Sequence, residues 1–90
     1  MNPYEELANA IVLQAVKDYV PYYKKLKEYR EYNTNGLSPE GLKKYNRELK
    51  KREREFQEIV DFFHSAWFAT LTNVNPELIL AKLEAEVASI

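Results

Sequence analysis

Apolar side chains recur at helical spacing through most of the chain, and polar side chains fill the positions between them. The clearest stripe, which we call the seam, lies between residues 41 and 63, where the steps between its members alternate between three and four residues. Its members are Leu42, Tyr45, Leu49, Arg52, Phe56, Ile59 and Phe63. Such spacing keeps one side of a helix against a partner, so we expect a second helix to lie along the seam.

A polar residue followed by proline stands at the start of each periodic stretch. The three pairs are Asn2-Pro3, Ser38-Pro39 and Asn75-Pro76. The polar side chain can cap the helix, and proline suits the first helical position, where its missing N–H costs no hydrogen bond. The pattern predicts helices over about 3–32, 39–64 and 76–88, in one all-α domain of 90 residues.

The segment Asn33-Thr34-Asn35-Gly36 is the clearest turn, and Gly36 or Asn35 is expected to adopt the left-handed conformation that ends a helix. A connection this short makes the flanking helices antiparallel neighbours. We therefore predict an antiparallel helical hairpin, with the final helix packed across its base to complete a three- or four-helix bundle.

Two positions in this pattern leave alternatives open. Helical spacing continues through Pro21, which favours a first helix kinked there over two helices that meet at Val20. After Phe63, the second helix either continues to about Leu71 or bends at His64-Ser65 into a short separate turn.

The net charge of −1 hides a strong separation of charge along the chain. Residues 24–54 hold eleven bases and five acids, a net charge of +6, while the remainder holds two bases and nine acids, a net charge of −7. Folding back at the turn brings the bases of both arms to one end of the hairpin, which we call the basic tip. Its candidate binding residues are Lys24, Lys27, Arg30, Lys43, Lys44, Arg47, Lys50, Lys51 and Arg54.

The basic tip is expected to contact either an acidic protein surface or phosphate groups. Tyrosines accompany the bases, and aromatic rings among Lys and Arg can stack on single-stranded nucleic acid. They are Tyr22, Tyr23, Tyr29, Tyr32 and Tyr45. Glu48, Glu53 and Glu55 would repel phosphates, however, so an ordinary solvated helix face is the competing interpretation.

Arg52 is a charge within an otherwise apolar seam, and a buried charge is costly unless it is paired. It marks a point where the hairpin opens to solvent, or it pairs with an acid such as Glu28. In a self-associating hairpin, it would help to fix the register.

Aromatic residues are concentrated after the second helix, and Phe62, Trp67 and Phe68 form a candidate docking patch for a partner or for a second copy of the chain. The alternative is that these rings are simply the core beneath the final helix.

No pattern in the sequence supports catalysis, so we predict a non-enzymatic protein without cofactor or metal. The chain has no cysteine and a single histidine, His64, whereas a metal site usually needs several ligands. No glycine-rich phosphate loop or nucleophile motif is present. No secretion signal or membrane-spanning run is apparent, which predicts a cytoplasmic protein.

Both ends of the chain resemble small uncharacterised accessory proteins of phages and mobile elements of Gram-positive bacteria. The resemblance rests on ANAIVLQAVKDY at residues 8–19, on FFHSAWFATLT at residues 62–72 and on a final Leu-Ile-x-x-x-Leu-like segment, and it excludes the basic middle. It implies a viral protein in the host cytoplasm that binds and inhibits or redirects a host complex, as anti-CRISPR and other anti-defence inhibitors do. The expected partner is a host or phage protein, or a nucleoprotein complex. Nucleic acid binding and a homodimer are the alternatives.

Overall fold

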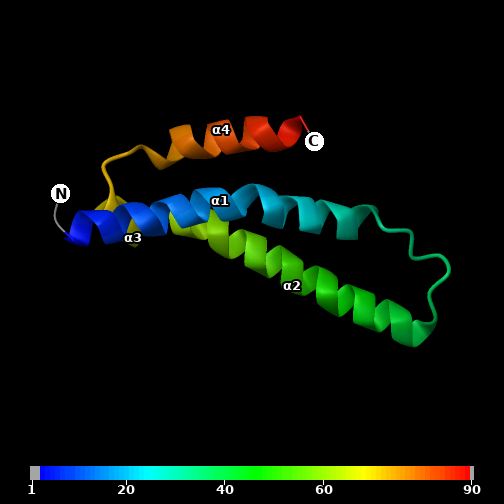
Figure 1. The fold of residues 1–90 in the computed structure, drawn as a ribbon. Helices are drawn as coiled ribbons and strands as arrows, with labels where there is room; N and C mark the ends of the chain where they lie inside the picture. The colour runs from blue at the N-terminus through cyan, green and yellow to red at the C-terminus, as the bar shows by residue number, and fades with distance from the viewer. Residues whose placement is uncertain (1–2, 90) are drawn as a thin grey trace.

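Four α-helices and no strand make up the secondary structure of residues 3–89, which the computed structural model describes, apart from the side chain of Tyr4 (Figure 1). The helices are α1 (Pro3–Glu31), α2 (Pro39–Phe63), α3 (Ala66–Leu71) and α4 (Pro76–Ala88). α1 packs against α2 in an antiparallel hairpin and also contacts α3 and α4. The predicted all-α fold and its helical hairpin are confirmed.

Two of the predicted helix starts have the expected caps. The Ser38 side chain accepts a hydrogen bond from the Gly41 N–H at 3.1 Å, and the Asn75 side chain accepts one from the Glu77 N–H at 2.9 Å. Proline occupies the first turn of both helices, where it removes no helical hydrogen bond. The predicted cap at Asn2 lies outside the described residues.

The connection between α1 and α2 turns without the left-handed residue that was predicted. No described residue has a positive φ angle, so the prediction for Gly36 or Asn35 is wrong. The Asn33 side chain instead accepts a hydrogen bond from the Asn35 N–H at 3.0 Å, and the Leu37 N–H donates to the Thr34 carbonyl at 3.1 Å. A side-chain turn followed by a backbone turn therefore reverses the chain.

α1 is uninterrupted through Pro21, which means that the alternative of two helices meeting at Val20 is wrong. Proline removes one hydrogen bond from a helix interior, at a cost of roughly 3 kcal/mol. Tyr19 and Leu26, both buried, anchor the helix on either side of Pro21 and compensate for that cost. The bend at Pro21 itself stays a prediction.

Ser65 separates α2 from α3. Its hydroxyl donates a hydrogen bond to the Phe62 carbonyl at 2.6 Å and accepts one from the Phe68 N–H at 3.1 Å. One side chain thus satisfies the end of one helix and the start of the next. The alternative of a bend at His64-Ser65 is confirmed, and the extension of α2 to Leu71 is wrong.

The core lies where all four helices meet, which we call the closed end. Its buried cluster is Tyr19, Phe63, Phe68, Leu80, Leu83 and Val87. α4 lies along α1 and runs in the same direction (Figure 1). Its three buried residues, Leu80, Leu83 and Val87, belong to that cluster. The final helix therefore covers the closed end and leaves the basic tip uncovered.

The molecule is elongated, with extents of 55 × 25 × 18 Å. Its radius of gyration is 16.4 Å, whereas a compact domain of this length would have about 12 Å. α2 diverges from α1 toward the connecting turn (Figure 1). The basic tip therefore projects from the closed end as a two-helix arm.

Candidate functional site

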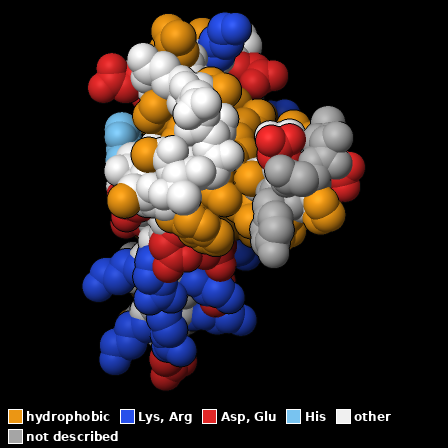
Figure 2. Space-filling view, turned by 90° about the vertical axis from the view of Figure 1, so that its left-hand side faces the viewer, with side chains coloured by type: hydrophobic (Ala, Val, Ile, Leu, Met, Phe, Trp, Pro, Cys, Tyr) orange, Lys and Arg blue, Asp and Glu red, His pale blue; other side chains and the backbone are white. Residues whose placement is uncertain are grey.

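Six bases form a continuous basic face along α2. They are Lys43, Lys44, Arg47, Lys50, Lys51 and Arg54. With 3.6 residues per turn, they fall within an arc of roughly 120° on the side opposite the seam, over a length of about 17 Å. Every residue on that arc between positions 43 and 54 is Lys or Arg. Figure 2 shows the blue side chains of this part of the molecule gathered below the hydrophobic closed end.

The basic face is exposed, and its charges are not paired with carboxylates in the described part of the chain. All six residues are exposed. Among the described residues, none of the six lies within 4.0 Å of a carboxylate. An uncompensated row of bases in water is the arrangement that attracts a negatively charged partner.

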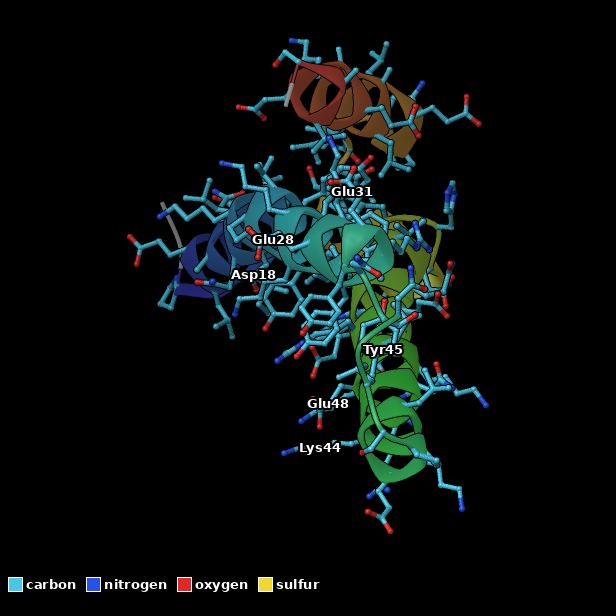
Figure 3. The ribbon with its side chains drawn as sticks, turned by 90° about the vertical axis from the view of Figure 1, so that its right-hand side faces the viewer. Asp18, Glu28, Glu31, Lys44, Tyr45 and Glu48 are labelled. Carbon is cyan, nitrogen blue, oxygen red and sulfur yellow. The ribbon has the colours of Figure 1, made fainter. Side chains whose placement is uncertain are left out.

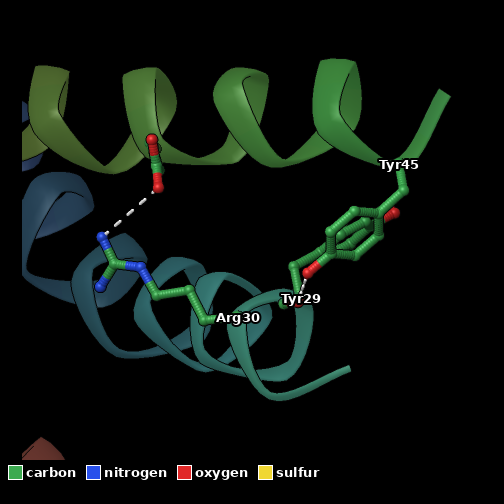
Figure 4. A network of polar contacts seen from close by, with 4 residues as sticks. Tyr29, Arg30 and Tyr45 are labelled. Carbon is green, nitrogen blue, oxygen red and sulfur yellow. Dashed lines mark hydrogen bonds and ion pairs between the residues drawn. The ribbon is translucent and has the colours of Figure 1, made fainter. Parts of the chain in front are cut away.

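The three predicted bases of α1 do not extend this face. The basic face lies opposite the seam, and Lys44 at its edge lines a groove with Glu28 of α1. Arg30 reaches across the hairpin to Glu53 at 3.8 Å (Figure 4). Lys27 lies 3.9 Å from Glu31. Lys24 is exposed. The structure thus brings together the six bases of α2, whereas two of the three α1 bases lie beside carboxylates.

Tyrosines fill the space where α1 and α2 diverge. Tyr45 stacks against Tyr29 and against Tyr32, with ring centroids 6.0 and 5.7 Å apart. The Tyr45 hydroxyl donates a hydrogen bond to the Tyr29 carbonyl (Figure 4). These contacts join the two arms. Packing between the helices therefore accounts for Tyr29 and Tyr45, two of the tyrosines that were considered as stacking partners for nucleobases. Tyr32 is the exception, because its side chain is exposed.

These tyrosines line a groove of about 490 Å³ together with carboxylates. Glu28 comes from α1, and Glu48 and Lys44 come from α2. Figure 3 shows Lys44 and Glu48 projecting from α2 to the same side as Glu28. The rings therefore lie beside acids rather than in the middle of the basic face, which disfavours their use as a stacking platform for nucleic acid.

Arg52 is half-buried and pairs within its own helix. Its guanidinium lies 3.3 Å from the Glu55 carboxylate and 5.6 Å from the centre of the Tyr29 ring. The predicted pairing with Glu28 is wrong, because the Arg52 guanidinium pairs instead with Glu55, one turn away on the same helix. A hydrogen bond with the Tyr29 side chain, together with Glu55, raises the pKa of Arg52. The Arg52 Nε is buried without a hydrogen-bond partner among the described residues.

The structure divides the candidate aromatic patch. Phe68 is 1% exposed and belongs to the core, so it is not accessible to a partner. Trp67 is 57% exposed, and its ring meets the half-buried Phe62 edge to face at 5.8 Å. Neighbouring residues on a helix point about 100° apart, which is why Trp67 faces outward when Phe68 faces inward.

A second groove, which we call the acidic groove, contains Trp67 and Phe62. Its volume is about 460 Å³ and it lies between α1 and α2 near the closed end. The residues that line it are Ile11, Gln14, Ala15, Asp18, Tyr22, Glu55, Glu58, Ile59, Phe62 and Trp67. Sequence reasoning missed Asp18 and Glu58. The available sequence signal for this groove was the presence of acidic residues between apolar positions on two helices that pack against each other.

Nothing in the described part of the chain indicates a metal centre. No group of three or more His, Cys, Asp or Glu side chains in residues 3–89 is placed to hold a metal ion. His64 is exposed at the end of α2. Within the same residues, no helix combines the length and apolar character needed to cross a membrane.

No protein-family model, curated protein or solved structure matches the chain. The resemblance to phage accessory proteins is therefore still a prediction, and the surface itself is the basis for a functional proposal.

Proposed function

We propose that this chain is a non-enzymatic binding protein that uses the basic face of α2 to contact an acidic surface of a protein complex. The observation that supports this proposal is the row of six exposed bases without a carboxylate partner among the described residues. Holding like charges side by side is unfavourable for the free protein, and a negatively charged partner relieves that repulsion.

In the setting that the resemblance implies, the partner is a host or phage protein complex, and binding inhibits or redirects it. An acidic protein surface is favoured over nucleic acid because Tyr29 and Tyr45 are engaged with each other, and Glu28 and Glu48 flank them.

Charge reversal with a matched control tests the proposal. The double variant Lys43→Glu/Lys50→Glu changes the basic face, and Lys17→Glu/Lys82→Glu makes the same change in net charge at the two bases outside residues 24–54. The wild type and both variants are used to capture proteins from a bacterial lysate. We expect the proteins captured by the wild type to be retained by the control and lost by the basic-face variant. Equal retention by both variants would contradict the proposal.

Direct binding of DNA or RNA is the second candidate, favoured by the length and continuity of the basic face. Contact of all six bases with phosphates predicts that the logarithm of the affinity falls with the logarithm of salt concentration with a slope of about −5 for duplex DNA. The slope is measured by fluorescence anisotropy with a labelled oligonucleotide. Absence of binding at low salt would exclude this candidate and leave the protein partner.

A further inference from the structure

We propose that the acidic groove is a second binding surface, and that it binds a partner helix with an apolar stripe flanked by Lys and Arg. This proposal is independent of the function proposed for the basic face, since it concerns a different surface with the opposite charge. It rests on the floor of the groove, on the charge of its rim and on its length.

The floor of the acidic groove is apolar and remains accessible. Its apolar lining comes from three helices: Ile11 and Ala15 of α1, Ile59 and Phe62 of α2, and Trp67 of α3. Leu7, one turn before Ile11 on α1, is 60% exposed and extends this apolar strip. An exposed Trp in an apolar groove is the kind of residue on which binding energy concentrates.

The rim of the acidic groove has carboxylates on both sides, and no Lys or Arg is among the described residues that line it, although Lys25 lies 5.9 Å from the centre of the Tyr22 ring. Asp18 stands on α1, and Glu55 and Glu58 stand on α2. Glu55 is already paired with Arg52, and Asp18 accepts a hydrogen bond from Gln14 at 2.8 Å. The charge of Glu58 has no cationic partner among the described residues. A net negative rim around an apolar floor selects a cationic amphipathic partner.

The dimensions of the groove suit a helix. From Ile11 to Tyr22, the α1 side extends for about 17 Å, or roughly three turns. α4 covers a different side of α1, because none of its described residues lines the groove. The position is therefore open to a helix from outside the chain.

A second copy of the chain is a poor occupant on grounds of charge. A symmetric contact between two acidic grooves would bring the carboxylates of both rims together. The basic face of another copy has the right charge. However, the side of α2 that carries this face has only Lys and Arg between positions 43 and 54, so it offers no apolar stripe for the floor of the groove. These mismatches favour a helix from another protein that carries both an apolar stripe and flanking Lys and Arg.

The probe is a synthetic helical peptide of about 14 residues, with Leu at steps of three and four and Lys on both sides of the stripe. The peptide contains no aromatic residue, so all tryptophan emission comes from Trp67, the single tryptophan of the chain. Binding in the acidic groove is expected to shift the Trp67 emission to shorter wavelength and to saturate. A peptide with Glu in place of Lys is expected to leave the emission unchanged. Calorimetric binding of the Lys peptide without any change in the Trp67 emission would overturn the proposal, as would no binding.

Two charge-matched pairs of variants locate the site. Glu58→Lys should weaken binding of the peptide by at least about threefold, and Asp18→Lys/Glu58→Lys by about tenfold, because each reversal replaces an attraction with a repulsion. Glu86→Lys and Glu6→Lys/Glu86→Lys make the same charge changes at exposed positions outside the groove and should bind like the wild type. Circular dichroism confirms folding. Equal weakening by groove and control variants would overturn the proposal.

Sedimentation velocity of the free protein tests the alternative occupant. The wild type is expected to remain monomeric at the highest concentration used with the peptide. A dimer whose population depends on Glu58→Lys but not on Glu86→Lys would show that a second copy occupies the acidic groove, and it would overturn the proposal.

Discussion

The closed end and the basic tip share α1 and α2, yet they use different interactions, and only the closed end also contains α3 and α4. At the closed end, Phe63 and Phe68 are almost completely buried and α4 covers the hairpin. At the tip, stacked tyrosines and a half-buried Arg52 join the arms while the bases stay in water. Apolar burial concentrated at one end can stabilise the fold while the other end keeps unneutralised charge.

Removing the most buried ring should have the largest effect. Phe63 is 0% exposed and packs against Phe62 and Phe68. We expect Phe63→Ala to lower the free energy of unfolding by about 3–5 kcal/mol, a large share of the stability of a domain this size. Tyr32→Ala, at the exposed end of the tyrosine stack, should cost about 1 kcal/mol or less. Urea denaturation measures both. Similar losses would mean that the two ends contribute equally to stability.

The two serine caps provide a comparison of intermediate size. Ser65 is half-buried and makes two hydrogen bonds between α2 and α3, whereas Ser38 is exposed and makes one at the start of α2. We expect Ser65→Ala to cost about 2 kcal/mol and Ser38→Ala about 1 kcal/mol. Thermal denaturation followed by circular dichroism measures the difference. A larger loss for Ser38→Ala would place the weaker point of the fold at the tip.

The closed end and the tip also differ in how much could be predicted from the sequence. The seam and the caps at Ser38 and Asn75 predicted the hairpin, because helical periodicity and capping depend on local residues. The left-handed conformation predicted at Gly36 was wrong, because the chain reverses through a hydrogen bond from the Asn35 N–H to the Asn33 side chain instead. Local alternatives of similar energy are not distinguished by residue type alone.

The candidate surfaces were predictable only in part. Bases on α2 could be assigned to one face, because the seam defines the opposite face. The pairing of Arg30 with Glu53 and the inward position of Phe68 depend on how the helices cross, which the sequence pattern does not specify. The acidic groove was missed for the same reason, because Asp18 and Glu58 come together only through tertiary packing.

Arg52 tests whether the tip depends on a charge in its seam. Replacing a half-buried ion pair with apolar or neutral groups is often neutral or stabilising, whereas removing one partner alone is costly. We therefore expect Arg52→Met/Glu55→Gln to change the free energy of unfolding by no more than about 1 kcal/mol. Glu55→Gln alone should destabilise more than the double variant, because Arg52 then lacks its carboxylate partner. Chemical denaturation of the wild type, Glu55→Gln and the double variant measures these differences. A large loss in the double variant would show that the ion pair stabilises the tip.

Alkaline pH should affect the closed end through Tyr19, and this is the smallest expected effect. Burial raises the pKa of the Tyr19 phenol, and the Glu84 carboxylate and Tyr23 raise it further. In the unfolded chain, the phenol ionises at its usual pKa of about 10. The folded state holds the phenol proton more tightly than the unfolded chain does. The resulting contribution to the free energy of unfolding is complete below pH 10 and is lost as the pH rises through the folded pKa. Tyr19→Phe lacks the ionisable group, so the wild type should lose stability relative to this variant only above about pH 10. Urea denaturation between pH 7 and 11 measures that difference, and ionisation of the other groups cancels between the two proteins. A difference that does not change with pH would show that the Tyr19 phenol ionises alike in both states.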